Sequence, residues 1–492
     1  MKNNIGKDSL ILTVSQFMVL GVNMLNVMLL SRFRTLEEYG TYSQIIMVCT
    51  IVITFFSAGF SQCINYFLGK SESFEEKKKF IKSYYGVVTF IGIAGGLVTL
   101  VLLPLIQRYF GNAAMAKYWY VLLFYPISHI LNAGIDRFFI SYRRSKLLLV
   151  FRLSHSFLIL SEAVLAIVLG LSFYQYMMIY TAAEVVFSAF TYLWIKKITG
   201  VLPFGFNKET VKKILVFAIP MALASLVSTI NTEMDKLIIG GLTDTETLAV
   251  YANAARELPF YIFSTSISSV TMPFIVKKVS KKNYSDAMEL WRKSINLSFY
   301  FMCFCVSVLF TFAPQVISVL YSDKYLTGTN VFRIYSLVLL FRVTYYGMVL
   351  NSMGRTKTIL RASVATMVIN LVLDVVLYKL LGFISPEAAL LGPAIATLLS
   401  VSVMNMYQLV LTKRLINVRF NDIYPIKPMS KIMLLNVVLS VVFFAVQQTA
   451  FRLVDYNRNA ISIIIGAVWV ATYALLVFKP VKALWKELND SK

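Results

Sequence analysis

The sequence predicts an all-α integral membrane protein with about fourteen transmembrane helices, and three observations lead to this fold class. The chain of 492 residues is 58% hydrophobic and only 14% charged, whereas soluble domains carry about a quarter charged residues. Apolar runs long enough to cross ~30 Å of hydrocarbon recur along the whole chain. The loops between these runs are alternately basic and neutral, which is typical of multi-pass membrane proteins.

The apolar runs define the predicted membrane spans. These are residues 9–31, 41–67, 82–106, 118–140, 147–171, 173–195, 214–240, 247–275, 294–313, 331–352, 358–381, 386–411, 431–449 and 460–478. No small-residue cleavage site follows the first run, so we predict an uncleaved membrane helix rather than a removable signal peptide. The longest connections have roughly twenty residues, which is too short for a soluble catalytic domain.

The charge distribution predicts the orientation of the chain in the membrane. Every second loop is basic, and the formal net charge is +23. The basic segments are 70–82, 141–146, 196–213, 276–293, 353–361, 412–431 and the tail from 479. By the positive-inside rule, these segments and both termini lie in the cytoplasm. We expect no nucleic-acid partner, because no basic domain lies outside the apolar segments.

Two pairs of short stretches indicate an internal duplication. Residues 31–44 match residues 240–254 with an offset of 209, so that Tyr42 corresponds to Tyr251. The stretch "ISYRRSKLLL" at 140–149 matches "NSMGRTKTIL" at 351–360 with an offset of 211. The shared spacing predicts a repeated unit of six helices.

Because six is an even number, both copies of the unit are expected to have the same orientation in the membrane. Parallel repeats of this kind build two bundles that rock about a central site. We therefore predict an N-terminal six-helix bundle at 1–200, a second bundle at 201–428, and two extra helices with a cytoplasmic tail at 429–492. The duplication favours a transporter that works by alternating access.

Residues that usually carry enzymatic or metal chemistry are sparse. Cys49, Cys63, Cys303 and Cys305 all lie in apolar runs, so neither a disulfide framework nor a zinc site is expected. The two histidines, His129 and His155, are isolated in the sequence, and we interpret both as packing or interface residues. P-loop, HExxH and GxSxG motifs are absent from the sequence, which argues against an ATP-driven pump or a hydrolase.

Charged residues inside the predicted spans are the candidate functional residues, because such charges are costly in a bilayer. Glu162, Glu184, Arg256, Glu257 and Arg342 fall near the middle of their spans, and the carboxylates Asp235 and Asp374 fall in the outer third. The basic candidates are Arg32, Arg137, Arg256 and Arg342, and the acidic candidates are Glu162, Glu184, Asp235 and Asp374. Each could instead form a structural ion pair, such as Arg256 with Glu257 or with Asp235.

The chain resembles the polysaccharide-transporter branch of the multidrug/oligosaccharidyl-lipid/polysaccharide exporter superfamily. The resemblance rests on "LEEYGTYS" at 36–43, the stretch 217–242 with Pro220 and Asp235, "NSMGRTKT" at 351–358, and the stretch 370–400. It extends over nearly the whole chain. One departure is "EAALLGPA" at 387–394, where the family often has "GAA".

The resemblance implies a MATE-like fold and a Wzx-type flippase. Such a protein moves undecaprenyl-pyrophosphate-linked oligosaccharide repeat units of O-antigen or capsule across a bacterial cytoplasmic (inner) membrane. Arg256 and Arg342, with Arg137 and Arg32, would then bind the pyrophosphate, since the arginine fork fits phosphate oxygens. The four acidic candidates would couple transport to protons or sodium ions.

No cofactor is expected, and a proton or sodium gradient or the membrane potential would drive transport. Expected partners are the lipid-linked glycan, membrane lipids and the polysaccharide polymerase machinery. Two alternatives stay open: an ion-coupled multidrug and toxin extrusion exporter, and a lipid II flippase. The exporter would need an acidic or aromatic cavity, and Arg256 and Arg342 argue against it. A membrane polymerase or ligase would need a sizeable external loop with Arg and His, and no predicted external loop is large enough.

Overall fold

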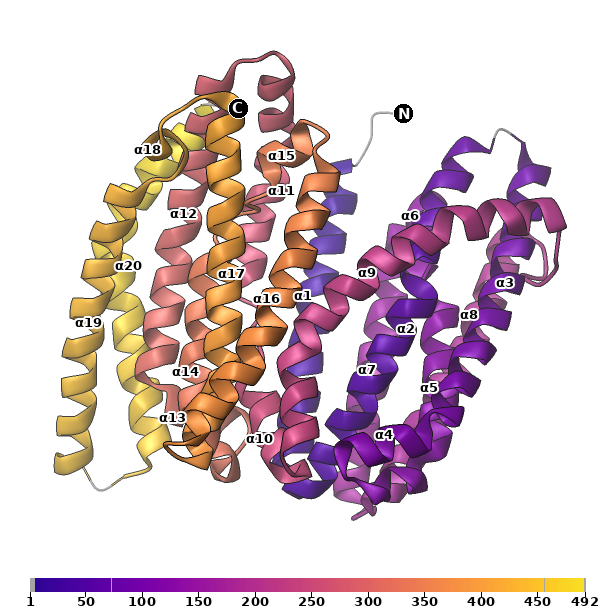
Figure 1. Ribbon diagram of the computed structural model, residues 1–492, viewed down its shortest axis with the longest axis horizontal. Helices are drawn as coiled ribbons and strands as arrows, with labels where there is room; N and C mark the ends of the chain where they lie inside the picture. Colours follow the sequence, from indigo (N-terminus) through magenta and orange to yellow (C-terminus); the bar gives the residue numbers. More distant parts are fainter. Residues whose placement is uncertain (1–4, 72, 455, 491–492) are drawn as a thin grey trace. The chain divides into compact units, whose positions relative to one another are not determined.

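The computed structural model describes residues 5–71, 73–454 and 456–490, and the described chain contains helices and connecting turns but no β-strand. It divides into two compact units, Met1–Ala249 (unit 1) and Val250–Lys492 (unit 2). Figure 1 shows the helices in chain order by colour. The all-α fold class predicted from composition is confirmed.

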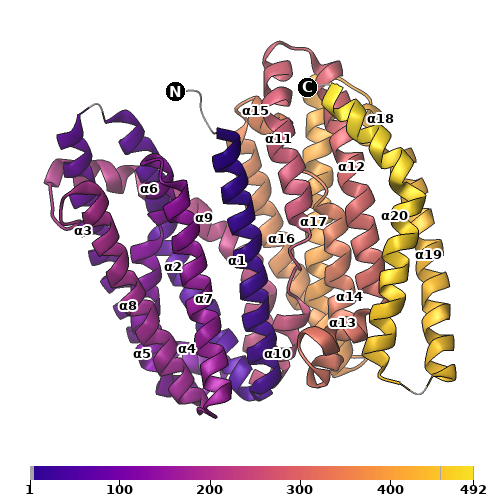
Figure 2. The same ribbon diagram turned by 180° about the vertical axis from the view of Figure 1, so that it is seen from behind.

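Unit 1 contains the helices up to α9 and most of the cavity-forming residues discussed below. Its elements are α1 Ile5–Phe33, α2 Leu36–Lys70, α3 Phe74–Val101, α4 Leu103–Phe110, the 3-10 helix η1 Ala113–Tyr118, α5 Trp119–Asn132, α6 Ile135–Ser141, α7 Ser145–Val168, α8 Phe173–Thr199 and α9 Lys208–Leu242. Helix α10, Thr245–Ala254, crosses the boundary between the units. Seen from behind, α1 runs beside α7 (Figure 2).

Unit 2 ends with the two extra helices that the sequence predicts after the second bundle. Its elements are α11 Tyr261–Ser280, α12 Tyr284–Thr311, α13 Ala313–Leu320, η2 Asp323–Gly328, α14 Thr329–Val338, η3 Leu339–Phe341, α15 Met348–Ser352, α16 Thr356–Gly382, α17 Pro386–Ile416, α18 Phe420–Ile423, α19 Ile426–Leu453 and α20 Arg458–Asp490. Trp469 of α20 stacks on Phe443 of α19 with a centroid distance of 4.9 Å. Large aromatic contacts thus join the two extra helices.

In the described part of the chain, eleven helices are long and apolar enough to cross a membrane, and each overlaps one predicted span. The remaining three predicted spans are wrong as continuous helices. The structure divides 118–140 between α5 and α6, 247–275 between α10 and α11, and 331–352 between α14, η3 and α15. The total of fourteen crossings and the cytoplasmic placement of the termini stay predictions.

The predicted duplication is confirmed in the local structure of the two copies. Helix α3 begins at Phe74 and α12 at Tyr284, and α4 begins at Leu103 and α13 at Ala313, an offset of 210 in both cases. A residue with positive φ precedes α7 (Arg143, 55°) and its counterpart α16 (Gly354, 70°). The two copies therefore share their helix order and their turn geometry.

One difference between the copies lies at their second long helix. In the first copy, α2 runs without interruption from Leu36 to Lys70, whereas its counterpart in the second copy is divided into α10 and α11. The break at residues 255–260 contains Arg256, Glu257 and Pro259. Proline removes a backbone donor and clashes with the preceding turn, and the two charges favour a site away from hydrocarbon.

Glycines allow close helix packing in unit 1. A Cβ added at Gly59 of α2 would lie 1.8 Å from the carbonyl oxygen of Ala218 in α9, and one at Gly40 would lie 2.1 Å from that of Thr245. Small residues that let backbones approach are typical of helix pairs in membranes. Helix α9 thus belongs to unit 1 in the structure. The predicted boundaries at 200 and 428 separate the copies of the sequence repeat rather than the compact units, and they stay predictions.

A capping box fixes the start of α2. The Thr35 side chain accepts a hydrogen bond from the Glu38 amide at 3.1 Å, and the Glu38 carboxylate accepts one from the Thr35 amide at 3.2 Å. We expect Thr35→Ala to destabilise the protein by about 1 kcal/mol. Thermal unfolding of the purified protein would measure this loss. Thr35→Ser keeps the hydroxyl and should leave the midpoint unchanged, and an equal loss in both variants would contradict the capping role.

Candidate functional site

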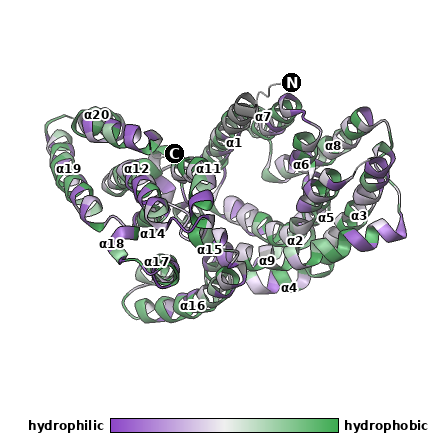
Figure 3. Cartoon of the chain, turned by 90° about the horizontal axis from the view of Figure 1, so that it is seen from above, coloured by the Kyte–Doolittle hydropathy of each residue, from purple (hydrophilic) through white to green (hydrophobic). Residues whose placement is uncertain are grey.

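A polar cavity lies among the helices of unit 1. Its volume is about 580 Å³, within the range of small-molecule pockets. Its polar lining residues are Gln16, Asn23, Asn26, Tyr42, Tyr125, His129, Asn132, Asp136, Arg152, His155, Ser156 and Tyr180. They come from α1, α2, α5, α6, α7 and α8; the end-on view shows α1 and α7 on one side and α2 and α5 on the other (Figure 3). Six helices of unit 1 therefore contribute to one polar site.

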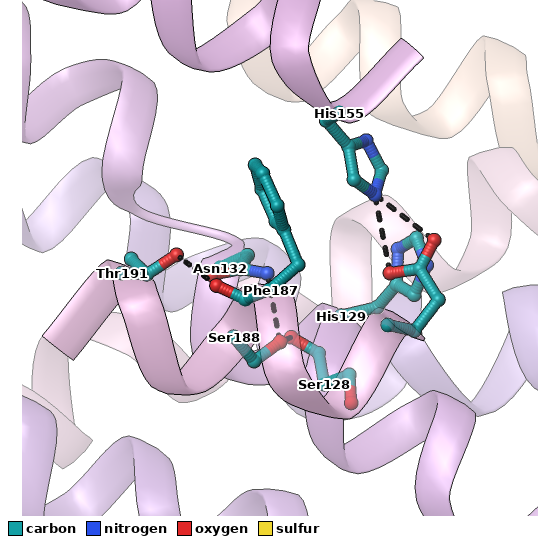
Figure 4. Close-up of polar contacts among 8 residues, drawn as sticks. Ser128, His129, Asn132, His155, Phe187, Ser188 and Thr191 are labelled. Carbon is teal, nitrogen blue, oxygen red and sulfur yellow. Dashed lines mark hydrogen bonds and ion pairs between the residues drawn. The ribbon is translucent and has the colours of Figure 1, made fainter. Parts of the chain in front are cut away.

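Both histidines of the chain contact one buried carboxylate. Nε2 of His155 lies 2.9 and 3.1 Å from the two carboxylate oxygens of Glu184, and Nε2 of His129 lies 3.4 Å from Oε2. Figure 4 shows the two histidine rings near one another. Glu184 is only 1% exposed and lies behind the two histidines, which line the cavity. The two histidines, which are isolated in the sequence, therefore meet at one contact between helices, and their interpretation as packing or interface residues lacked only the shared partner. We call this group the His–Glu–His cluster.

The cluster combines one buried acid with two bases on three different helices, α5, α7 and α8. A buried carboxylate is stable in such surroundings only when other groups compensate its charge. The Nε2 atom of His155 lies within hydrogen-bond distance of that carboxylate, and the His129 ring lies beside it. Within the described chain, no group of three or more His, Cys, Asp or Glu residues is placed to hold a metal ion.

Tyrosine rings cover the cluster on the side of α5 and α8. The ring centroids of Tyr125 and His129 are 4.0 Å apart, and those of Tyr125 and Tyr180 are 5.7 Å apart. Tyr176 continues the row at 6.0 Å from Tyr180. Tyrosine presents a flat apolar face with a polar end, so the row adds an amphipathic wall to the cavity.

An ion pair joins α6 and α7 at the cavity. Arg152 Nη2 lies 2.6 Å from Asp136 Oδ2, and Arg152 Nη1 donates to the Ser15 hydroxyl of α1 at 3.0 Å. The Asp136 carboxylate is thus neutralised by a neighbouring guanidinium. Both carboxyl groups at this cavity therefore have a basic neighbour: Asp136 has Arg152, and Glu184 has the two histidines.

Two amide oxygens at the cavity are buried without a hydrogen-bond partner among the described residues. They are Oδ1 of Asn26 in α1 and Oδ1 of Asn132 in α5, and both residues line the cavity. Asn132 Nδ2 donates to Ser188 Oγ at 2.9 Å, and Ser188 donates to the Ser128 carbonyl at 3.1 Å (Figure 4). This chain of contacts holds the Asn132 amide in place. A buried acceptor without a donor is costly, so both oxygens are suited to a ligand that donates hydrogen bonds.

The structure does not gather the predicted acidic candidates into one site. Glu162 of α7 is 4% exposed, and neither of its carboxylate oxygens has a hydrogen-bond partner among the described residues. Asp235 is buried in α9 of unit 1. Asp374 is buried in α16 of unit 2 and accepts a hydrogen bond from Asn370 at 2.8 Å. Of the four, Glu184 alone contacts cavity-lining histidines, and the coupling roles stay predictions.

Arg342 lies at a helix break rather than within a helix. In unit 2, its Nη2 is 2.7 Å from Oε1 of Glu257 and its Nε is 3.2 Å from Oε2. This bidentate pair joins the break after α10 to the break after η3. The ion pair shown for Glu257 is thus with Arg342, and the alternative pairs of Arg256 with Glu257 or with Asp235 stay predictions. The Arg342 side chain remains 45% exposed.

Side chains hold the backbone of the break around Arg342. The Ser264 hydroxyl donates to the Arg342 carbonyl, and Asn405 Nδ2 donates to the Phe341 carbonyl at 3.1 Å. Trp291 Nε1 donates to the Thr344 hydroxyl at 2.8 Å. Irregular backbone at membrane depth requires such partners, because hydrocarbon offers none.

The other predicted arginines are not members of the contacts just described. Arg256 is exposed at the first break of unit 2, Arg32 is exposed in the last turn of α1, and Arg137 is half-buried in α6. Arg137 directly follows Asp136, which lines the cavity of unit 1. The substrate-binding roles of Arg256, Arg32 and Arg137 stay predictions.

The chain matches the family described as "Polysaccharide biosynthesis protein" over residues 29–330. Among curated proteins, it is 24% identical over 203 residues to the capsular polysaccharide biosynthesis protein CapF of Staphylococcus aureus, covering 40% of this chain and 49% of CapF. It is 21% identical over 180 residues to the probable lipid II flippase MurJ of Rhizobium tropici, covering 35% of this chain and 34% of that protein. The alignments thus span half or less of the length of these relatives.

Solved structures share the fold over most of the chain. The inward closed conformation of the lipid II flippase MurJ has a TM-score of 0.70 at 18% identity and covers 95% of this chain and 99% of its own. An inward-facing MATE transporter of the MOP superfamily has a TM-score of 0.64 at 16% identity and covers 80% of this chain and 94% of its own. The predicted MATE-like fold is therefore confirmed.

Proposed function

Because the chain belongs to the polysaccharide biosynthesis protein family, we propose that it is a flippase for lipid-linked oligosaccharide repeat units. The substrate is an undecaprenyl-pyrophosphate-linked glycan of the O-antigen or capsule type. It crosses the bacterial cytoplasmic membrane by alternating access. The names of the two curated relatives, which refer to capsule biosynthesis and to lipid II, support this class of substrate.

The observation that carries the proposal is the polar cavity of unit 1 with its two unpartnered amide oxygens. Sugar hydroxyls can donate to Asn26 and Asn132, and sugar rings can pack against the faces of Tyr125 and Tyr180. The polar side chains replace the water that a glycan loses when it leaves solution. A cavity of this chemistry in a membrane bundle suits a glycan better than an apolar drug.

The pyrophosphate requires cationic groups, and we propose Arg342 and Arg256 of unit 2 for this role. Arg342 already binds a carboxylate with two nitrogens, and a phosphate offers the same pair of acceptors. The pyrophosphate would therefore compete with Glu257. Arg137 and Arg32 are further basic candidates along the path.

We propose that a proton gradient drives transport through the His–Glu–His cluster. An acid and two imidazoles in contact can exchange a proton with a water-filled cavity. Glu162, Asp235 and Asp374 are further candidates for ion coupling. A sodium gradient or the membrane potential is the alternative source of energy, and no cofactor is invoked.

A lipid II flippase is the second candidate, because the likeness to MurJ covers nearly the whole chain. The two functions share the lipid pyrophosphate and differ in the sugar. A multidrug exporter is less consistent with the cavity of unit 1, since each carboxyl group there already has a basic neighbour. The polysaccharide polymerase machinery is a proposed partner.

Deletion of the gene in its own host tests the proposal. Surface polysaccharide would be quantified together with the leaflet that holds the lipid-linked repeat unit. We expect the polymer to be lost and the unit to remain on the cytoplasmic face, with recovery when the wild-type gene is returned. Accumulation of lipid II would instead favour the second candidate. Normal polymer with increased drug sensitivity would contradict both flippase functions and favour an exporter.

The Arg342–Glu257 pair gives a sharper test of pyrophosphate binding. Arg342→Ala should reduce surface polymer by about tenfold or more, because a phosphate contact of this kind contributes ~1.4 kcal/mol or more. Glu257→Gln removes the competing carboxylate and should preserve polymer synthesis. Polymer and membrane abundance of each variant would be measured by complementation of the deletion strain.

A purely structural pair predicts a different result. In that case Arg342→Ala and Glu257→Gln would lose polymer equally, because each breaks the same contact. Arg414→Ala, at an exposed position of the predicted basic loop 412–431, serves as a matched control for the loss of one positive charge. Equal loss in both pair variants would refute the role of Arg342 in binding substrate.

A further inference from the structure

A second cavity lies in unit 2, where three of the predicted basic segments converge. Its volume is about 430 Å³, and it is lined by α12, α18, α19, α20 and the turn between α18 and α19. Arg292 and Lys293 come from segment 276–293, Lys427 from segment 412–431, and Glu487 from the tail. Figures 1 and 2 show α18 at the end of α20 that carries the C-terminus. Residues far apart in sequence thus form one charged pocket.

The charges of this cavity are partly matched within the protein. Lys293 Nζ lies 2.7 Å from Glu289 Oε1 and 3.9 Å from Glu487 Oε2, which ties α12 to α20. Asp422 accepts a hydrogen bond from the Arg419 amide at 3.2 Å and so caps α18. No hydrogen bond or ion pair is found for the side chains of Arg292 and Lys427 among the described residues, although Arg292 lies near enough to Glu289 to interact with it electrostatically. The direct ion pair of Glu289 is with Lys293, so the cavity has two cations that can bind an anion.

A buried amide oxygen requires that the ligand of this cavity also has a hydrogen-bond donor. Asn296 of α12 lines the cavity, and its Oδ1 is buried without a hydrogen-bond partner among the described residues. An inorganic anion offers no donor to this oxygen when it is fully ionised. A ligand that carries both an anionic phosphate and hydroxyl groups would satisfy the cations and the amide together.

The surroundings of the cavity are suited to acyl chains. Leu434 of α19 is 65% exposed and Leu475 of α20 is 81% exposed, so the two extra helices present apolar faces that a bilayer would cover. Trp485 lies next to the lining residue Leu484 and is also exposed. Tryptophan is enriched at the level of lipid headgroups. The positive-inside rule predicts that this side is cytoplasmic, where anionic lipids gather.

We propose that this cavity binds the headgroup of an anionic phospholipid of the phosphatidylglycerol class. The phosphate contacts Arg292 and Lys427, and a glycerol hydroxyl donates to Asn296. The acyl chains lie along α19 and α20. The site is separate from the glycan cavity of unit 1 and does not depend on the transported substrate. Its ligand anchors the two extra helices to the second bundle.

Native mass spectrometry of the full-length protein released from nanodiscs tests the site. Nanodiscs of phosphatidylglycerol and of phosphatidylcholine would be compared for wild type and for Arg292→Gln/Lys427→Gln. We expect the wild type to retain phosphatidylglycerol and the double variant to bind it roughly thirtyfold more weakly, because each basic side chain strengthens binding to anionic lipid by about fivefold. Retention of phosphatidylcholine at the same level would overturn the proposal.

Two further variants separate the site from general effects of charge. Lys281→Gln/Lys413→Gln removes two exposed charges from the same two basic segments, away from the cavity, and should retain the lipid fully. Arg292→Lys/Lys427→Arg conserves charge and should also retain it. Equal loss in the control pair would overturn the proposal. Displacement of the lipid by millimolar inorganic phosphate would assign the cavity to a free anion and overturn the lipid site as well.

Discussion

Replacement of Glu184 with glutamine is expected to abolish the response of flipping to a pH gradient. The substitution keeps the size of the side chain and an oxygen that His155 can contact, but it removes the acid that could carry a proton between the two histidines. Wild-type protein in proteoliposomes should flip the lipid-linked glycan about tenfold faster, or more, with an imposed proton gradient than without one, a ratio that corresponds to ~1.4 kcal/mol. The Glu184→Gln variant should flip the glycan at the same slow rate with the proton gradient and without it.

The control for this experiment is Glu209→Gln. Glu209 is an exposed acid in the first turn of α9, and it pairs with Lys213 rather than with a histidine. This variant should respond to the gradient like the wild type. A normal gradient response in Glu184→Gln would contradict proton coupling through the cluster and would leave a sodium gradient or the membrane potential as the energy source.

Gly59→Ala is expected to have the largest effect on stability. The added Cβ would lie 1.8 Å from the Ala218 carbonyl oxygen, and a backbone atom cannot move aside as a flexible side chain can. Helices α2 and α9 would have to separate, which we expect to cost ~3 kcal/mol, at the upper end of ordinary overpacking. Thermal unfolding of the purified protein would show a lower midpoint, and the yield of folded protein would fall.

Gly69→Ala in the same helix provides the matched control. A Cβ at Gly69 would meet no atom within 4 Å, so the only expected change is the higher helix propensity of alanine, worth up to ~1 kcal/mol. The two substitutions should therefore shift the midpoint in opposite directions. Similar shifts in both variants would contradict the close approach of α2 and α9.

The sequence could predict the helical membrane fold and the internal duplication, because both are visible from composition and from the spacing of residues along the chain. Low charge content, long apolar runs and alternating basic loops identify a helical membrane protein without any knowledge of contacts. The duplication is visible because the first turns of α2 and α10 have Glu37 and Glu246 in equivalent places. These signals lie within short stretches of sequence, so they can be read without knowledge of tertiary contacts.

The helix breaks were harder to predict, because proline alone does not decide them. Pro126, Pro220 and Pro393 lie inside continuous helices, whereas Pro259 lies at the break between α10 and α11. The difference is that Arg256 and Glu257 accompany Pro259, so a backbone that leaves the helix also brings charges to a polar contact. At Arg342 the break depends on partners as distant as Asn405, which no local pattern reveals.

The His–Glu–His cluster could not be assembled from sequence for a similar reason. His129, His155 and Glu184 lie on three helices, and helix faces cannot be paired without the fold. One signal was available: each of these three residues is a titratable group inside an apolar run. Titratable residues inside apolar runs are costly unless they pair, so the presence of three of them indicates a contact among these residues.

The break between α10 and α11 also has a consequence for biosynthesis. Helix α2 has 35 residues and can enter the bilayer as one segment, but its counterpart α10 has only 10, about half the length that a crossing requires. An arginine at mid-segment adds about 2.5–3.5 kcal/mol to the cost of insertion. We therefore expect the nascent α10–α11 segment to enter the bilayer less readily than α2, although the two segments occupy equivalent places in the repeat.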